Sequence, residues 1–163
     1  MGGRKSGRDL IPMNNSELKR HLHERCLAIV QQRMSDAKEA MDAAQQSANQ
    51  EEKSSAGDKY ETGRAMAQIA RDQAAQQLDE ALKLKNALDQ INPSTSSARV
   101  MLGSLVITDQ NQFYISISAG KLEMNGVFIA ISPQSPIGKL LMNLQVNDVI
   151  TFNKQKQTVL SVC

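Results

Sequence analysis

The sequence is poor in aromatic residues: it has no tryptophan, three phenylalanines and two tyrosines among 163 residues. Four of these five lie in the last third of the chain, and Tyr60 is the only one before it. Aromatic side chains bury large areas and dominate protein cores. A compact core is therefore expected only in the C-terminal third. The rest of the chain must be held together by alanine, leucine and methionine, which suits a thin pair of helices.

Histidine and cysteine are equally scarce, with two of each. His21 and His23 are two residues apart, so on a helix they point to different faces and are poorly placed to share a metal ion. No histidine follows His23, which argues against a serine–histidine nucleophile. Cys26 and Cys163 match no metal-ligand spacing, and unpaired cysteines are ordinary in reducing compartments. We therefore do not expect an enzyme with an active site of its own.

Long apolar runs are also missing. None approaches the ~20 residues that a membrane-spanning helix needs, and no apolar stretch follows the basic N-terminus to make a secretory signal. We expect a cytoplasmic protein without a membrane partner. The net charge of +2 gives no general case for nucleic-acid binding. Residues 1–12 carry three basic side chains and one acidic one, and they are expected to form a disordered basic tail.

Residues 13–92 carry the pattern of a helical hairpin. A first helix is expected to start at an N-cap, Asn15 or Ser16, with Glu17 in its first turn. Apolar and small residues then recur at alternating steps of three and four, which is the seam of a coiled coil. This seam consists of Leu27, Val30, Met34, Ala37, Met41, Ala44 and Ala48. The seam residues become smaller along the chain, from leucine and valine to alanine, so the two helices can approach each other closely.

The helical pattern breaks at residues 54–57, where serine and glycine are poor helix-interior residues. Asp58 is a good N-cap for a second helix, and Glu61 lies three positions later, as in a capping box. Asn92 and Pro93 end this helix. Its expected seam consists of Met66, Ala70, Ala74, Leu78, Ala81, Leu84, Leu88 and Ile91. The result is an antiparallel hairpin about 50 Å long, with its tip near residues 51–62, far longer than its own core requires.

Residues 93–98 are expected to form a linker rich in serine. Residues 99–163 are expected to form a second domain, in which apolar residues recur at every second position, as they do in β-strands. A turn is expected at Asn125–Gly126, a short helix over residues 137–142 and a polar turn around residues 154–156. The expected strands cover residues 100–107, 113–117, 127–131, 148–152 and 158–162. The predicted fold class is α+β: a long N-terminal coiled-coil hairpin, then a small antiparallel sheet with one short helix.

Asp58 and Glu61 allow two interpretations. Acids at this spacing cap a helix and interact favourably with its dipole, and such capping boxes are common. The alternative is a carboxylate pair presented to a metal ion, since Mg²⁺ is typically held by one or two carboxylates with water or phosphate completing the shell. What supports the second interpretation is the position at the apex of so long a hairpin, where a partial metal site could be completed by another protein.

The order of these parts resembles the bacterial Gre transcript-cleavage factors, which have a long N-terminal hairpin, a linker and a small FKBP-like β-domain. Two motifs carry the resemblance. Residues 57–62, Gly-Asp-Lys-Tyr-Glu-Thr, are similar to the Gly-Asp-x-x-Glu-Asn tip motif of that family. Residues 131–141, Ile-Ser-Pro-Gln-Ser-Pro-Ile-Gly-Lys-Leu-Leu, are similar to its Ser-Pro-Ile/Met-Gly/Ala-x-x-Leu segment. The resemblance covers roughly residues 16–162.

This resemblance implies a transcription elongation factor that acts as a monomer. In the family, the hairpin enters the secondary channel of RNA polymerase and its tip acids help to hold the second Mg²⁺, so that a backtracked polymerase cleaves its own transcript near the RNA 3′ end. Asp58 and Glu61 inherit this role by motif position. Ser135, Pro136 and Ile137 fall in the segment that contacts the polymerase. The Mg²⁺ is shared with the polymerase, and no cofactor of the protein's own is implied.

Basic residues near the tip, Lys53, Lys59 and Arg64, could meet RNA phosphates or could simply be solvated charge. Thr62 stands where the family usually has asparagine, and Lys59 and Tyr60 lie between the two acids. These differences keep a second function open, in which the protein occupies the channel and regulates transcription without stimulating cleavage.

Overall fold

The computed structural model describes the backbone of residues 14–53 and 57–163, and the side chains of residues 14–50 and 61–163. The predicted fold class is confirmed, because a long N-terminal helical hairpin precedes a small, mainly antiparallel sheet with one short helix. The described residues form two compact units. The hairpin unit is Arg25–Gln90, and the β-unit joins the helical residues up to Glu24 with Ile91–Cys163. The predicted tail at residues 1–12 lies outside the described part.

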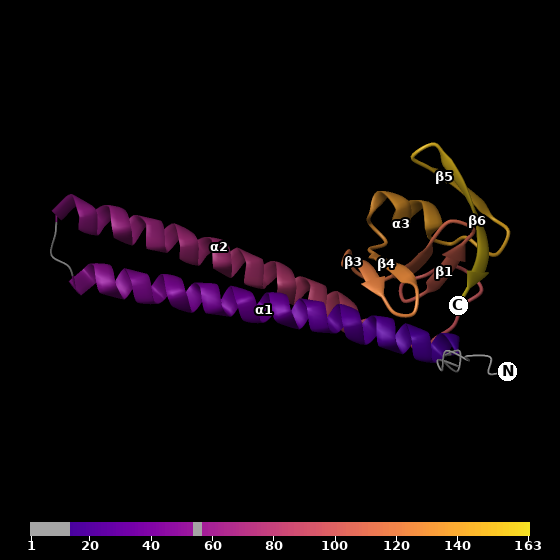
Figure 1. The fold of residues 1–163 in the computed structure, drawn as a ribbon, viewed down its shortest axis with the longest axis horizontal. Coiled ribbons are helices and arrows are strands. Elements are labelled where there is room, and N and C mark those ends of the chain that lie inside the picture. The colour runs from indigo at the N-terminus through magenta and orange to yellow at the C-terminus, as the bar shows by residue number, and fades with distance from the viewer. Residues whose placement is uncertain (1–13, 54–56) are drawn as a thin grey trace, which may run out of the picture. The chain divides into compact units, whose positions relative to one another are not determined.

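Two helices make the hairpin unit, α1 (Asn15–Lys53) and α2 (Gly57–Asp89), which run side by side in opposite directions (Figure 1). On α1 the predicted seam is confirmed. Val30, Ala37 and Ala44 are buried at heptad spacing, and the alternate positions, Met34 and Met41, are partly buried. Steps of three and four keep one stripe of a helix facing its partner.

On α2 the predicted seam is partly wrong. The buried residues follow one heptad series, Ala67, Ala74, Ala81 and Leu88, whereas Met66 is 66% exposed and Ala70 is exposed. A coiled-coil seam needs an average step of 3.5 residues. Residues at repeated steps of four, as from 66 to 70 to 74, move progressively around the helix and so do not all face the partner. The helix therefore turns a small alanine, not the large methionine, toward α1.

The helix starts also differ from the prediction. Asn14 is the N-cap of α1, because its side-chain oxygen accepts a hydrogen bond of 2.8 Å from the backbone N–H of Glu17. Asn15 and Ser16 already lie inside the helix. Helix α2 begins at Gly57, so Asp58 is its second residue instead of its cap. An acid in this first turn still interacts favourably with the helix dipole.

The β-unit contains one six-stranded sheet in the order β3-β4-β2-β1-β6-β5. Its elements are β1 (Leu105–Thr108), β2 (Gln112–Ile115), β3 (Gly120–Glu123), β4 (Val127–Ile131), α3 (Pro136–Leu141), β5 (Val149–Phe152) and β6 (Gln155–Val162). The prediction of an antiparallel sheet holds for every pair except one, because β2 and β4 run parallel.

Two local predictions in this unit are wrong. The first predicted strand starts five residues too early, since the chain bends at Gly103, whose φ is 91°. The polar turn lies at Asn153 and Lys154, both with positive φ, and residues 155 and 156 already belong to β6. Two central residues with positive φ make the tight hairpin turn that matches the twist of the strands.

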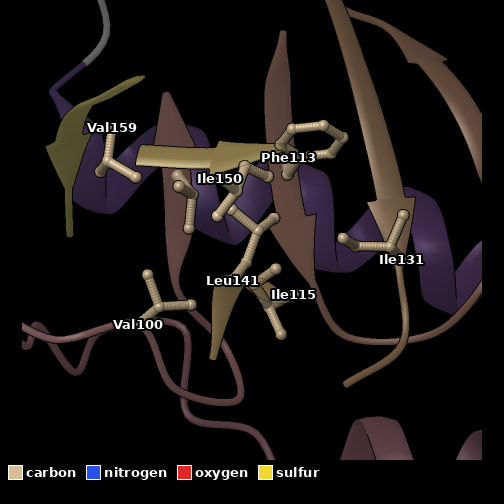
Figure 2. Packing of buried hydrophobic residues seen from close by; sticks show 8 residues of the cluster. Val100, Phe113, Ile115, Ile131, Leu141, Ile150 and Val159 are labelled. Atoms are coloured by element: carbon tan, nitrogen blue, oxygen red, sulfur yellow. The ribbon is translucent and has the colours of Figure 1, made fainter. Parts of the chain in front are cut away.

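The sheet has two covered faces. On one face, Phe113, Ile115, Ile131 and Val159 surround Leu141 of α3 (Figure 2). The register places Leu105, Tyr114 and Ala130 on the opposite face. There the first turns of α1 lie against the sheet, because His23 Nδ1 is 3.1 Å from the hydroxyl oxygen of Tyr114. The first ten residues of α1 thus belong to the β-unit, with Lys19 and Leu22 buried in it.

Candidate functional sites

The tip of the hairpin lies between the end of α1 at Lys53 and the start of α2 at Gly57. The side chains of three predicted site residues, Lys53, Asp58 and Lys59, lie outside the described part of the structure. Glu61 is described, and its side chain is exposed on α2. The backbone places Asp58 and Glu61 three residues apart within the first two turns of α2, a spacing that makes two positions neighbours on a helix surface.

Arg64, the third predicted base, lies one turn beyond Glu61 on the exposed surface of α2. It shares a hollow of about 140 Å³ between the two helices with Arg71. Two glutamines, Gln45 of α1 and Gln68 of α2, complete its polar lining. Arg64 and Arg71 thus lie on one side of the hairpin, further along α2 than Asp58 and Glu61.

The predicted contact segment of the β-unit has a clear local structure. Ser135 is the N-cap of α3: its hydroxyl oxygen accepts a hydrogen bond of 3.1 Å from Gly138 N–H and donates one of 2.7 Å to the Ser132 carbonyl. Pro136 follows at the first helical position, where its missing N–H is harmless. Both residues thus set the start of α3.

Ile137 has a different position from its two neighbours. It is partly buried against the hydrophobic core and lines a hollow of about 330 Å³ on the α3 face of the sheet. Phe113, Ile131 and Phe152 contribute to the same hollow. Sequence reasoning missed this site, although the clustering of aromatic residues in the last third was the signal that could have indicated it.

A second feature that the sequence did not reveal is a buried amine. Lys19 is 2% exposed, and its Nζ donates a hydrogen bond to the carbonyl oxygen of Thr95 in the linker. Burial lowers the pKa of the Lys19 ammonium, an effect that the nearby Cys163 thiol opposes. Burial likewise raises the pKa of the Cys163 thiol, and here Lys19 opposes the shift. The amine ties the first turns of α1 to the β-unit.

The two histidines lie as the spacing predicted, on different sides of α1. The Nδ1 atom of His21 lies 3.5 Å from Oε2 of Glu24 on the surface, whereas His23 contacts Tyr114 of the sheet. Among the side chains that the structure describes, no group of three or more histidine, cysteine, aspartate or glutamate residues could hold a metal ion. Within the same part of the chain, no helix combines the length and apolar character needed to cross a membrane.

Comparison with models of known protein families and with characterised proteins finds no match for this chain.

Proposed function

We propose that this protein is a transcription elongation factor that binds RNA polymerase, inserts its hairpin into the secondary channel and assists the Mg²⁺-dependent cleavage of backtracked RNA. The observation that carries this proposal is the hairpin. Its second helix has 33 residues, about 50 Å, and packs on α1 mainly through alanines. Such an arm is long and thin, which is the shape that a narrow channel admits.

The acids at the start of α2 give this arm a chemical role. Mg²⁺ keeps several water ligands and usually takes only one or two carboxylates from a protein. Asp58 and Glu61 fit such a partial set, with Glu61 exposed and able to face a partner. In a site shared with the polymerase, the metal would stabilise the attacking and leaving oxygens of phosphodiester hydrolysis. The protein's own contribution is to bring the two carboxylates to that site.

Transcript cleavage by stalled, backtracked polymerase complexes tests this proposal. We expect the wild-type protein to accelerate cleavage, and Asp58→Asn with Glu61→Gln to abolish the acceleration while polymerase binding persists. Glu39→Gln with Asp42→Asn is a matched control, because these exposed acids of α1 also lie three residues apart. The control should behave as wild type.

A factor that occupies the channel without cleavage gives a different result in the same assay. It would bind polymerase and slow nucleotide addition, and neither pair of substitutions would change that effect. The substitutions between and after the acids, Lys59, Tyr60 and Thr62, are the residues that favour this alternative. If the wild-type protein does not accelerate cleavage, the assisting role of Asp58 and Glu61 is refuted.

A further inference from the structure

The turn between β3 and β4 contains a pair of residues that the proposed function does not use. Glu123 pairs with Val127, so three residues connect the two strands. Asn125 and Gly126, the last two of them, are exposed, with φ angles of 53° and 148°. Gly126 thus gives the turn a backbone conformation that residues with a side chain rarely adopt. It also leaves the peptide nitrogen after Asn125 without a side chain beside it.

An asparagine followed by glycine can lose its amide without an enzyme. The backbone nitrogen of Gly126 attacks Cγ of the Asn125 side chain, a C–N bond forms, and the side-chain amide nitrogen leaves as ammonia. The product is a succinimide ring, which water then opens. Breaking the bond between the nitrogen and Cγ gives aspartate, whereas breaking the bond between the nitrogen and the backbone carbonyl carbon gives isoaspartate. Water is the only other reactant, and no atom is oxidised or reduced.

The hairpin of β3 and β4 lies at an edge of the sheet, where local opening costs little. Strand β3 is the outermost strand on its side and pairs with β4 alone. Of its four residues only Leu122 is buried. Segments with few buried apolar contacts open locally at a small cost in free energy. Such opening lets Asn125 leave its left-handed conformation and brings its Cγ to the peptide nitrogen of Gly126.

The β-unit contains a second asparagine that allows a direct comparison. Asn153 lies in the turn between β5 and β6, is exposed and has a φ of 50°. Strand β5 forms the opposite edge of the sheet, and Ile150 is its one fully buried residue. The residue after Asn153 is Lys154, which places a side chain beside the nitrogen that would attack. The two turns therefore differ chiefly in the residue that follows the asparagine.

We propose that Asn125 is a site of spontaneous deamidation in the folded protein, which converts it to aspartate and isoaspartate. This inference does not depend on the proposed function. Either product adds a negative charge two residues from Glu123. Isoaspartate also inserts a methylene group into the backbone of the turn, which disturbs the pairing of Glu123 with Val127. The modification therefore loosens β3 from β4 as the protein ages.

Incubation of the folded full chain at neutral and mildly alkaline pH tests the site. Peptide mass spectrometry follows the conversion of each side-chain amide to a carboxyl group, and an isoaspartate-specific methyltransferase labels the second product. We expect Asn125 to deamidate at least about tenfold faster than Asn153, a difference of about 1.4 kcal/mol in activation free energy. The rate at Asn125 should rise with pH, because the attacking nitrogen must lose its proton.

The Lys154→Gly variant tests the role of the following residue. It places a glycine after Asn153, at a φ of 65° that glycine adopts without strain. Deamidation of Asn153 should then approach the rate at Asn125, while the rate at Asn125 stays unchanged. An unchanged rate at Asn153 would contradict the role assigned to the glycine. Thermal unfolding checks that the variant keeps its fold.

The same chain unfolded in denaturant provides the reference rate. If Asn125 deamidates in the unfolded chain but stays intact over the same time in the folded protein, the turn protects it and the inference is wrong. Equal rates at Asn125 and Asn153 in the folded wild type would also overturn it.

Discussion

Lys19 and Cys163 place two ionisable groups inside the β-unit, and their pKa shifts have opposite consequences for stability. At a pH just above the ordinary pKa of a cysteine, the Cys163 thiol of the folded protein keeps its proton, whereas the same thiol in the unfolded chain has lost it. The free energy of unfolding therefore falls as the pH rises through this window. Folding lowers the pKa of Lys19, so this group acts in the other direction. At a pH between the folded and unfolded pKa values, the unfolded chain still carries the proton that the folded amine has lost, and the free energy of unfolding rises with pH.

The first prediction isolates the thiol. Cys163→Ser removes a thiol whose pKa is raised on folding. The variant should therefore lose less stability than wild type as the pH is raised above the ordinary pKa of a cysteine, about 8.5. Chemical denaturation from pH 7 to pH 10 measures the difference. The substitution also removes the effect of Cys163 that opposes the lowering of the Lys19 pKa, and the larger shift of Lys19 changes the pH dependence of stability in the same direction. Identical pH dependence in the two proteins would show that the Cys163 thiol titrates normally in the folded state.

At the scale of the element, α2 shows how a helix selects its buried stripe. Ala74 is 3% exposed in the seam, whereas Ala70 is exposed one turn earlier. The same substitution at the two positions tests this assignment. Ala74→Leu forces extra atoms between the helices and should destabilise the hairpin by about 1–3 kcal/mol, while Ala70→Leu should change stability by less than about 0.5 kcal/mol. Thermal unfolding followed by helical circular dichroism measures both, and equal effects would contradict the seam.

The hairpin between β5 and β6 carries local strain that a substitution can relieve. Lys154 has a φ of 65°, a left-handed conformation that is unfavourable for a residue with a side chain. Lys154→Gly should stabilise the β-unit by about 0.5–1 kcal/mol, after subtracting the greater freedom of glycine in the unfolded chain. Lys154→Val, which is β-branched, should destabilise it. Denaturant unfolding provides the comparison, and a stabilising valine would refute the strain.

Elements with strong local patterns were predicted well, and those without them were not. Residues 127–131, Val-Phe-Ile-Ala-Ile, are a short apolar run that follows an Asn-Gly turn, and β4 has these bounds. Strand β3 was missed because Leu122 is the only large apolar residue in its four. On α2 the predicted seam began with two steps of four, at Met66 and Ala70, but the heptad series through Ala74 decides which residues face α1. The apolar and small residues of α2 allow more than one series, and only packing against α1 selects the buried one.

At the scale of the whole molecule, the sequence indicates the two kinds of architecture but not the contacts between distant segments. The parallel pairing of β2 with β4 and the hydrogen bond of Lys19 to Thr95 join residues that no local period connects. The hollow beside Ile137 likewise forms from four separate segments. Of the predicted tip residues, Glu61 and Arg64 are placed on the surface of α2, and the pairing of Asp58 with Glu61 around a metal stays a prediction.

The Mg²⁺ dependence of transcript cleavage tests the central claim most directly. Backtracked polymerase complexes are assayed for cleavage rate over a range of Mg²⁺ concentrations, alone, with the wild-type protein and with the Asp58→Asn, Glu61→Gln variant. If the tip carboxylates complete a shared site, the wild type lowers the Mg²⁺ concentration that gives half-maximal cleavage, and the variant leaves it at the value of polymerase alone. Superimposable curves for the wild type and the variant would contradict the account.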